Sequence, residues 1–138
     1  MKKLIFILLF FSATKTIKAQ VPDTLAYLQS IVATKAQYIG QPFSVLMNNL
    51  QIQIKFYFPF ASMHADKTKE TSTSFAFYFP PTAEEIDLTY PHLEIYWLPS
   101  LNADQSRALR SQYRSVGWNQ QIATHYSMGI IADIKLRE

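Results

Sequence analysis

The sequence LQIQIKFYF, from Leu50 to Phe58, marks the point at which the hydrophobic period of this chain changes from 3.6 residues to 2. The even positions of the stretch are all apolar, and polar residues or a tyrosine alternate with them. Such alternation is typical of a β-strand with one buried face, because successive side chains of a strand point to opposite faces. The stretch therefore predicts a half-buried strand with Tyr57 on the face away from the core.

The tetrapeptide FYFP closes this stretch at 56–59 and recurs at 77–80, and YWLP at 96–99 is a looser third copy. The same alternation predicts two further strands, Ser74 to Phe79 and His92 to Leu98. We expect each proline to end its strand, since proline cannot donate the next hydrogen bond of the ladder. The tyrosines between the apolar pairs are then predicted to share the second face of the sheet: Tyr57, Tyr78 and Tyr96.

Helical spacing of apolar residues predicts three helices around these strands. One runs from Pro22 to Gln37, a short second one begins at Pro42, and a third runs from Asn102 to Val116. A last period-2 run, Met128 to Leu136, predicts a final strand. The order ααβββαβ indicates an α+β domain in which the helices pack on one face of a mainly antiparallel four-stranded sheet.

The first residues have the pattern of a secretory signal peptide. Met1-Lys2-Lys3 precedes an apolar run from Leu4 to Phe11, and small residues lead to Ala19. The eight apolar residues of that run are too few to span a bilayer, which takes about 20. We expect residues 1–19 to be a signal peptide cleaved after Ala19 and residues 20–138 to form one domain. Such a protein would be periplasmic or secreted, with no stable membrane insertion after cleavage.

Removal of residues 1–19 changes the formal charge of the chain from +3 to −1, because four lysines leave with them. The remaining charge gives no reason to expect nucleic acid as a partner. The absence of cysteine excludes a disulfide framework and a lipid-modified cysteine. A domain of this size buries a sufficient core without such cross-links. The sequence leaves the oligomeric state open.

The segment YIGQPFSVL, from Tyr38 to Leu46, resembles the opening of small exported bacterial proteins in which an Ile-Gly pair starts a short helix before an antiparallel sheet. The helix-helix-meander order is similar to the domain shared by the beta-lactamase inhibitory proteins and the small outer-membrane assembly lipoproteins. The resemblance covers roughly residues 25–98. It implies a binding module that acts through protein contacts.

Motifs for covalent catalysis and for cofactors are absent from the sequence. It contains no Gly-x-Ser-x-Gly elbow and no cysteine nucleophile. Only three glycines are present, which excludes glycine-rich loops that cradle phosphate. We therefore expect no cofactor, and we interpret Ser62 and Ser100 as loop and cap residues.

One group of residues could ligate a metal or serve an enzyme. These residues lie in the two polar segments between the predicted strands, and they would come together if both segments lie at one end of the sheet. They are His64, Asp66, Glu84, Glu85 and Asp87. Their spacing matches no established zinc pattern, and solvated loop charge is the alternative interpretation. His92 and His125 are interpreted as surface or edge residues.

Two surfaces are candidates for ligand binding. Tyr57, Tyr78 and Tyr96 combine aromatic area with hydrogen-bonding groups, as protein and sugar sites do, unless a helix covers them. Arg107, Arg110 and Arg114 follow one another on one side of the third predicted helix. Such a row suits an acidic partner or a carboxylated glycan, or is simply a solvated helix face.

The sequence thus favours an exported, non-enzymatic binding module for a protein or glycan partner. The alternative is a small periplasmic hydrolase or metal-dependent enzyme that uses the histidine and acidic residues of the two polar segments.

Overall fold

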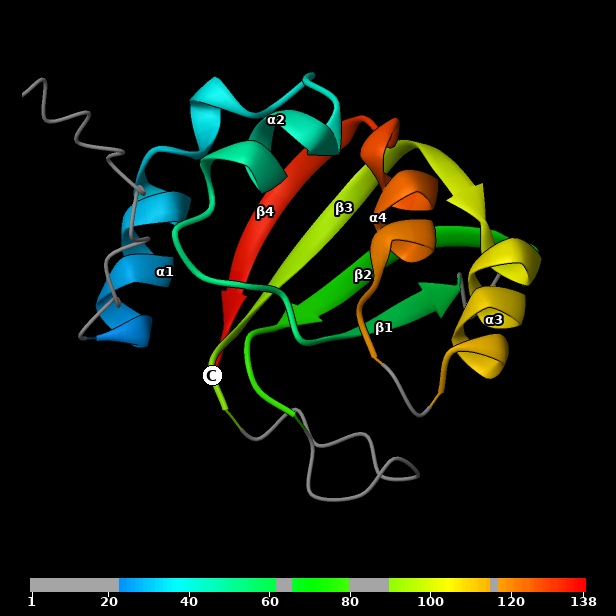
Figure 1. Cartoon of the computed structure of the whole chain (residues 1–138). Helices are drawn as coiled ribbons and strands as arrows, with labels where there is room; N and C mark the ends of the chain where they lie inside the picture. The colour runs from blue at the N-terminus through cyan, green and yellow to red at the C-terminus, as the bar shows by residue number, and fades with distance from the viewer. Residues whose placement is uncertain (1–22, 62–65, 80–89, 115–116) are drawn as a thin grey trace, which may run out of the picture.

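The structure, a computed structural model, describes residues 23–61, 66–79, 90–114 and 117–138. Figure 1 shows helices gathered against one side of a twisted sheet. The elements are α1 (Thr24–Ala33), a 3-10 helix η1 (Lys35–Gln37), α2 (Phe43–Asn49), β1 (Phe56–Ala61), β2 (Lys69–Ala76), β3 (His92–Asn102), α3 (Ala103–Gln112), α4 (Gln120–Ser127) and β4 (Ile131–Arg137). The predicted α+β class and the order ααβββαβ are confirmed, and α4 is an additional short helix before the last strand.

The four strands form one antiparallel sheet in the order β1-β2-β3-β4. One row of register partners crosses the whole sheet: Tyr57 on β1, Phe75 on β2, Leu93 on β3 and Leu136 on β4. Register partners point to the same side of a sheet. These four side chains therefore share one face.

The helices bury this face. Buried residues of α1, α2 and α4 form one hydrophobic core with the inward side chains of the strands. At its centre the ring of Phe43 stacks on that of Phe75, with centroids 4.7 Å apart, and Trp97 stacks on Tyr126 at 5.9 Å. The predicted packing of helices on a single face is therefore confirmed, and the sheet has one covered face and one face without a helix among the described elements.

The placement of Tyr57 differs from the prediction, which is wrong on this point. Tyr57 is only 2% exposed and lies in the core. The reason is that residues 50–55 are not strand: the chain bends at residues 51 and 52, and β1 begins only at Phe56. The bend shifts the alternation by one residue, so Tyr57 turns inward while Phe56 and Phe58 turn to the other face.

Two of the prolines also lie inside strands rather than ending them. Pro59 lies within β1, an edge strand on which one row of backbone groups needs no strand partner. Pro99 lies within β3 where the pairing with β2 is interrupted between Tyr96 and Leu101. Both positions tolerate a missing backbone N–H.

The bounds of β2 and β4 also differ from those that the sequence predicts. β2 begins at Lys69, inside a segment predicted to be loop, and ends at Ala76, so Tyr78 lies beyond the strand. In β4 a register irregularity turns Ile131 inward together with Ile134. Met128, predicted to belong to that strand, is 75% exposed at the end of α4.

Within the described residues, no helix is both long enough and apolar enough to cross a membrane.

Candidate functional site

The face of the sheet opposite the core is here called the open face. It is formed by the side chains that alternate with the core residues: Phe56, Phe58, Phe60, Ser72, Ser74, Ala76, His92, Glu94, Tyr96, Asp133, Lys135 and Arg137. Phe58, Phe60 and Tyr96 are partly exposed there. His92, predicted to be a surface or edge residue, is buried, and its Nδ1 lies 3.0 Å from the carbonyl oxygen of Tyr90.

Two cations contact Tyr96 on the open face, and its register partner on β4 is Asp133. The ammonium group of Lys135 lies 4.5 Å from the centre of the Tyr96 ring, and Arg137 donates to the Tyr96 hydroxyl at 3.0 Å. Arg137 also pairs with Glu94 at 2.6 Å, and Ser72 donates to the same carboxylate at 2.9 Å. Burial opposes the charge of Glu94, but these hydrogen bonds outweigh it and hold the pKa of that carboxyl below its ordinary value.

Two of the three phenylalanines of β1, Phe56 and Phe58, lie beneath an arginine from α3. The rings of Phe58 and Phe60 lie 5.0 Å apart. The guanidinium of Arg110 lies 4.4 Å from the centre of the Phe58 ring and 5.5 Å from that of Phe56. Cation–π contacts of this kind orient a planar guanidinium over an aromatic face. The Arg110 side chain of α3 thus extends past the edge strand β1 and places a positive charge on the open face.

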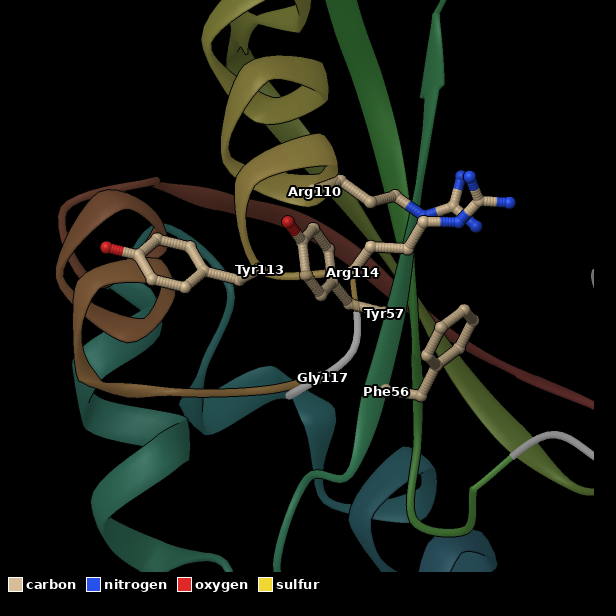
Figure 2. A pocket seen from close by; sticks show the side chains of 6 residues that line it. All are labelled: Phe56, Tyr57, Arg110, Tyr113, Arg114 and Gly117. Carbon is tan, nitrogen blue, oxygen red and sulfur yellow. The ribbon is translucent and has the colours of Figure 1, made fainter. Parts of the chain in front are cut away.

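The structure separates the three arginines that the sequence groups together. Arg107 pairs with Asp104 on its own helix and donates to the carbonyl oxygen of Lys67 at 3.3 Å. Arg110 and Arg114 instead line a pocket between α3 and β1. Figure 2 shows both side chains extending toward the side of β1 on which Phe56 lies, while Tyr57 points to the other side.

The pocket is small, with about 10 Å³ open to the centre of a water-sized sphere, which is about what one water molecule requires. Its lining residues are Phe56, Tyr57, Arg110, Tyr113, Arg114 and Gly117. Gly117 is required there, because its φ is +71° and a Cβ would lie 2.6 Å from the carbonyl oxygen of Lys55. The same carbonyl accepts a hydrogen bond from the backbone N–H of Trp118 at 3.1 Å.

The hydroxyl of Tyr57 in this pocket is buried and has no hydrogen-bond partner among the described residues. Burial raises the pKa of Tyr57 above its ordinary value, so the hydroxyl remains protonated and can donate. Burial also lowers the pKa of Arg110, and the charge of Arg114 acts in the same direction. An arginine nevertheless stays charged. The lining of the pocket therefore includes the positive charge of Arg110 on one side of β1 and the Tyr57 hydroxyl on the other.

The predicted tyrosine strip does not form one surface. Tyr57 is in the core, whereas Tyr96 lies on the open face. Tyr78 lies past the end of β2, where its ring meets that of Tyr90 at a centroid distance of 5.1 Å. Only Tyr96 of the three belongs to the open face, and the phenylalanines of β1 provide the neighbouring aromatic area.

Of the predicted metal-ligating group, only Asp66 falls within the described residues; His64, Glu84, Glu85 and Asp87 lie outside them. Asp66 accepts from the backbone and hydroxyl of Thr68 and lies 3.9 Å from the ammonium group of Lys69. No cluster of three or more metal-ligating side chains occurs in the part of the chain that the structure describes.

A buried polar network lies on the covered face, and no pattern in the sequence indicates it. Glu70, which the sequence placed in a loop, is fully buried on β2. It accepts hydrogen bonds from Thr73, Ser106 and Tyr126, the last at 2.9 Å. Burial raises the pKa of Glu70 despite these donors. Indole Nε1 of Trp97 donates to the Thr73 hydroxyl at 2.8 Å, which extends the network into the aromatic core.

The network includes a Ser–His contact, with the Ser106 hydroxyl 2.8 Å from Nε2 of His125. Burial lowers the pKa of His125, which favours the neutral base. Ser106 is fully buried, however, and its hydroxyl donates to Glu70. A nucleophile must reach a substrate and give its proton to the base. This serine does neither, so the contact is one of structural polar packing.

No family model, no curated protein and no solved structure matches this chain.

Proposed function

We propose that the protein is an exported, non-enzymatic binding module whose open face holds a partner protein. The observation that carries the proposal is the aromatic area of Phe58, Phe60 and Tyr96, which is partly exposed and has cations seated over or beside its rings. Aromatic residues and arginine are enriched where proteins bind one another. Such a surface suits a partner that presents apolar side chains together with acidic ones.

A protein partner fits this surface better than a glycan does. Sugar sites pair aromatic rings with several polar side chains that can bond hydroxyl groups. On the open face, Ser72 and Ser74 are buried, and Glu94 is already bonded to Arg137 and Ser72. The area around Phe58 and Phe60 is therefore mainly apolar and cationic.

Capture from envelope extracts tests the proposal. The exported protein should retain one or more specific proteins, and a Phe60→Ser/Tyr96→Ser variant should lose them while keeping its circular dichroism spectrum and cooperative melting. Met128→Ser, which changes an exposed side chain at the end of α4, is the matched control and should retain the partner. Equal capture by both variants would overturn the proposal, and so would elution of the bound material by free sugars.

Export is the part of the proposal that depends on the sequence of residues 1–19. Protein recovered from the periplasm or the medium should have a mass that corresponds to a chain beginning at or near Gln20. A membrane-bound chain with an intact Met1 would contradict export by cleavage.

A further inference from the structure

One end of the molecule is built from three segments without a charged side chain. These segments are residues 36–49, 97–102 and 126–132, and aspartate, glutamate, lysine and arginine are absent from all of them. They contain α2, the last part of β3, and the connection from the end of α4 to the start of β4. Together they are called the uncharged end.

Backbone hydrogen bonds join the three segments. The N–H of Gly40 donates to the carbonyl oxygen of Ile131 at 2.8 Å, and that of Phe43 donates to Gly129 at 2.8 Å. On the other side, the N–H of Leu98 donates to Ile130 at 3.1 Å. The connection between α4 and β4 therefore lies between the other two segments, and Figure 1 shows α2, the end of α4 and the start of β4 at the same end of the sheet.

Large apolar side chains are exposed at the uncharged end. Met128 is 75% exposed and Leu98 is 71% exposed, and Ile39 and Val45 are exposed to a smaller extent. These four are among six large hydrophobic side chains that are exposed in the described part of the chain. Single exposed apolar residues are common, but a group of them on one surface marks an interaction site.

The charged residues next to these segments are paired with one another. Lys35 precedes the first segment and Asp133 follows the last, and their side chains form an ion pair at 2.5 Å. Asp104, which follows the middle segment, pairs with Arg107. The surroundings of the uncharged end thus present little net charge that could steer a charged partner toward it.

A second copy of the chain fits such a surface. Two-fold symmetry brings the same patch of two copies together, and two uncharged patches meet without repulsion between like charges. The cores of protein interfaces are likewise depleted of charged residues and enriched in methionine. A lipid surface fits less well, because segments that lie on membranes carry lysine or arginine beside their apolar side chains, and these segments have neither.

We propose that the uncharged end is the interface of a homodimer, in which Leu98 and Met128 of each copy pack against the uncharged end of the other. Phe58 and Phe60 lie on β1, at the opposite edge of the sheet from β4, and are not part of this interface. The proposal therefore goes beyond the function proposed above and does not depend on it.

Sedimentation equilibrium of the exported protein over a series of concentrations tests the dimer. The natural protein should show a monomer–dimer equilibrium. Leu98→Glu and Met128→Glu should each raise the dissociation constant roughly tenfold or more, because each places a charge in an apolar contact on both copies. Phe79→Glu makes the same change at a side chain that is 64% exposed and lies outside the uncharged end, so it should leave the constant unchanged.

Both glutamate variants should keep the circular dichroism spectrum and the cooperative melting of the natural protein, because the side chains that they replace are exposed. A natural protein that stays monomeric up to its solubility limit would overturn the proposal. So would a dimer that Phe79→Glu or Phe60→Ser/Tyr96→Ser weakens as much as Met128→Glu does. Co-sedimentation with phosphatidylcholine vesicles that Met128→Glu abolishes, in a protein without dimers, would assign the uncharged end to a membrane surface instead.

Discussion

The covered face and the open face of the sheet both carry aromatic rings, but their polar groups are used differently. On the covered face, the hydroxyls of Thr73, Ser106 and Tyr126 are all turned to the buried carboxylate of Glu70. On the open face, the cations of Arg110 and Lys135 lie over aromatic rings at the protein surface. Polar groups that satisfy one another inside the fold stabilise it, whereas donors that remain at the surface can bind a ligand.

The largest expected effect is on core packing. Phe75→Ala should lower the free energy of unfolding by about 3–5 kcal/mol, because it removes a fully buried ring that contacts Phe43, Trp97 and Tyr126. Phe60→Ala on the open face should cost less than about 1.5 kcal/mol, since its ring is only partly buried. Chemical denaturation measures both values. Similar losses would show that the two faces are not distinct.

The second-largest expected effect on stability concerns the hydroxyls of Tyr57 and Tyr126, whose ring centroids lie 5.5 Å apart. Tyr126→Phe should lower the free energy of unfolding by about 1–3 kcal/mol, because it removes a donor to the buried carboxylate of Glu70. Tyr57→Phe removes a hydroxyl for which the described part of the chain offers no partner, so stability should stay the same or rise by about 1 kcal/mol. Thermal unfolding of both variants makes the comparison. Destabilisation by Tyr57→Phe would mean that its hydroxyl is satisfied in solution.

The pH dependence of stability should report the charge of Glu70. Burial raises the pKa of Glu70 in the folded state above 4.5, its ordinary value. The folded state then holds a proton that the unfolded state releases, so this contribution is complete below pH 4.5 and is lost as the pH rises toward the folded pKa. Glu70→Gln cannot lose a proton. Its stability relative to the natural protein should therefore increase with pH across this window, by about 1.4 kcal/mol per unit of pKa shift.

Denaturation of both proteins at a series of pH values gives this difference directly. A difference that stays constant from acidic to neutral pH would show that Glu70 titrates in the folded protein as it does in the unfolded chain.

The smallest expected effect concerns the ion pair on the open face. Arg137→Gln removes the bond to Glu94, but half of the Arg137 side chain is exposed. The loss of stability should be less than about 1 kcal/mol and should shrink as salt is added. Urea denaturation at low and high ionic strength measures it. A large, salt-independent loss would mean that Arg137 also supports the packing of the sheet.

The fold class could be predicted because periodicity and caps are local properties. The side chain of Asp23 accepts from the backbone of Ala26, and that of Asn102 accepts from Gln105, as helix-start signals predict. The face of β1 could not be predicted in the same way. Both of its sides are apolar, so the bend before Phe56, which is set by packing rather than by composition, decides which side is buried.

The candidate site was predictable only in part. The arginine row on the third helix was visible in the sequence, but the partner of each arginine depends on tertiary contacts: Arg107 meets Asp104, and Arg110 meets Phe58. The Glu70 network was invisible, because a glutamate among serines and threonines has the composition of a loop. Its burial follows only once Ser106 and Tyr126, distant in sequence, supply the donors.

Oxidative footprinting of the exported protein, with and without envelope extract, tests most directly whether the open face is the binding surface. The account predicts that Phe58, Phe60 and Tyr96 lose labelling when the extract is added. Phe79 and Met128, which are 64% and 75% exposed, should stay equally labelled in both samples. Protection of Phe79 and Met128 with unchanged labelling of Phe58, Phe60 and Tyr96 would contradict it.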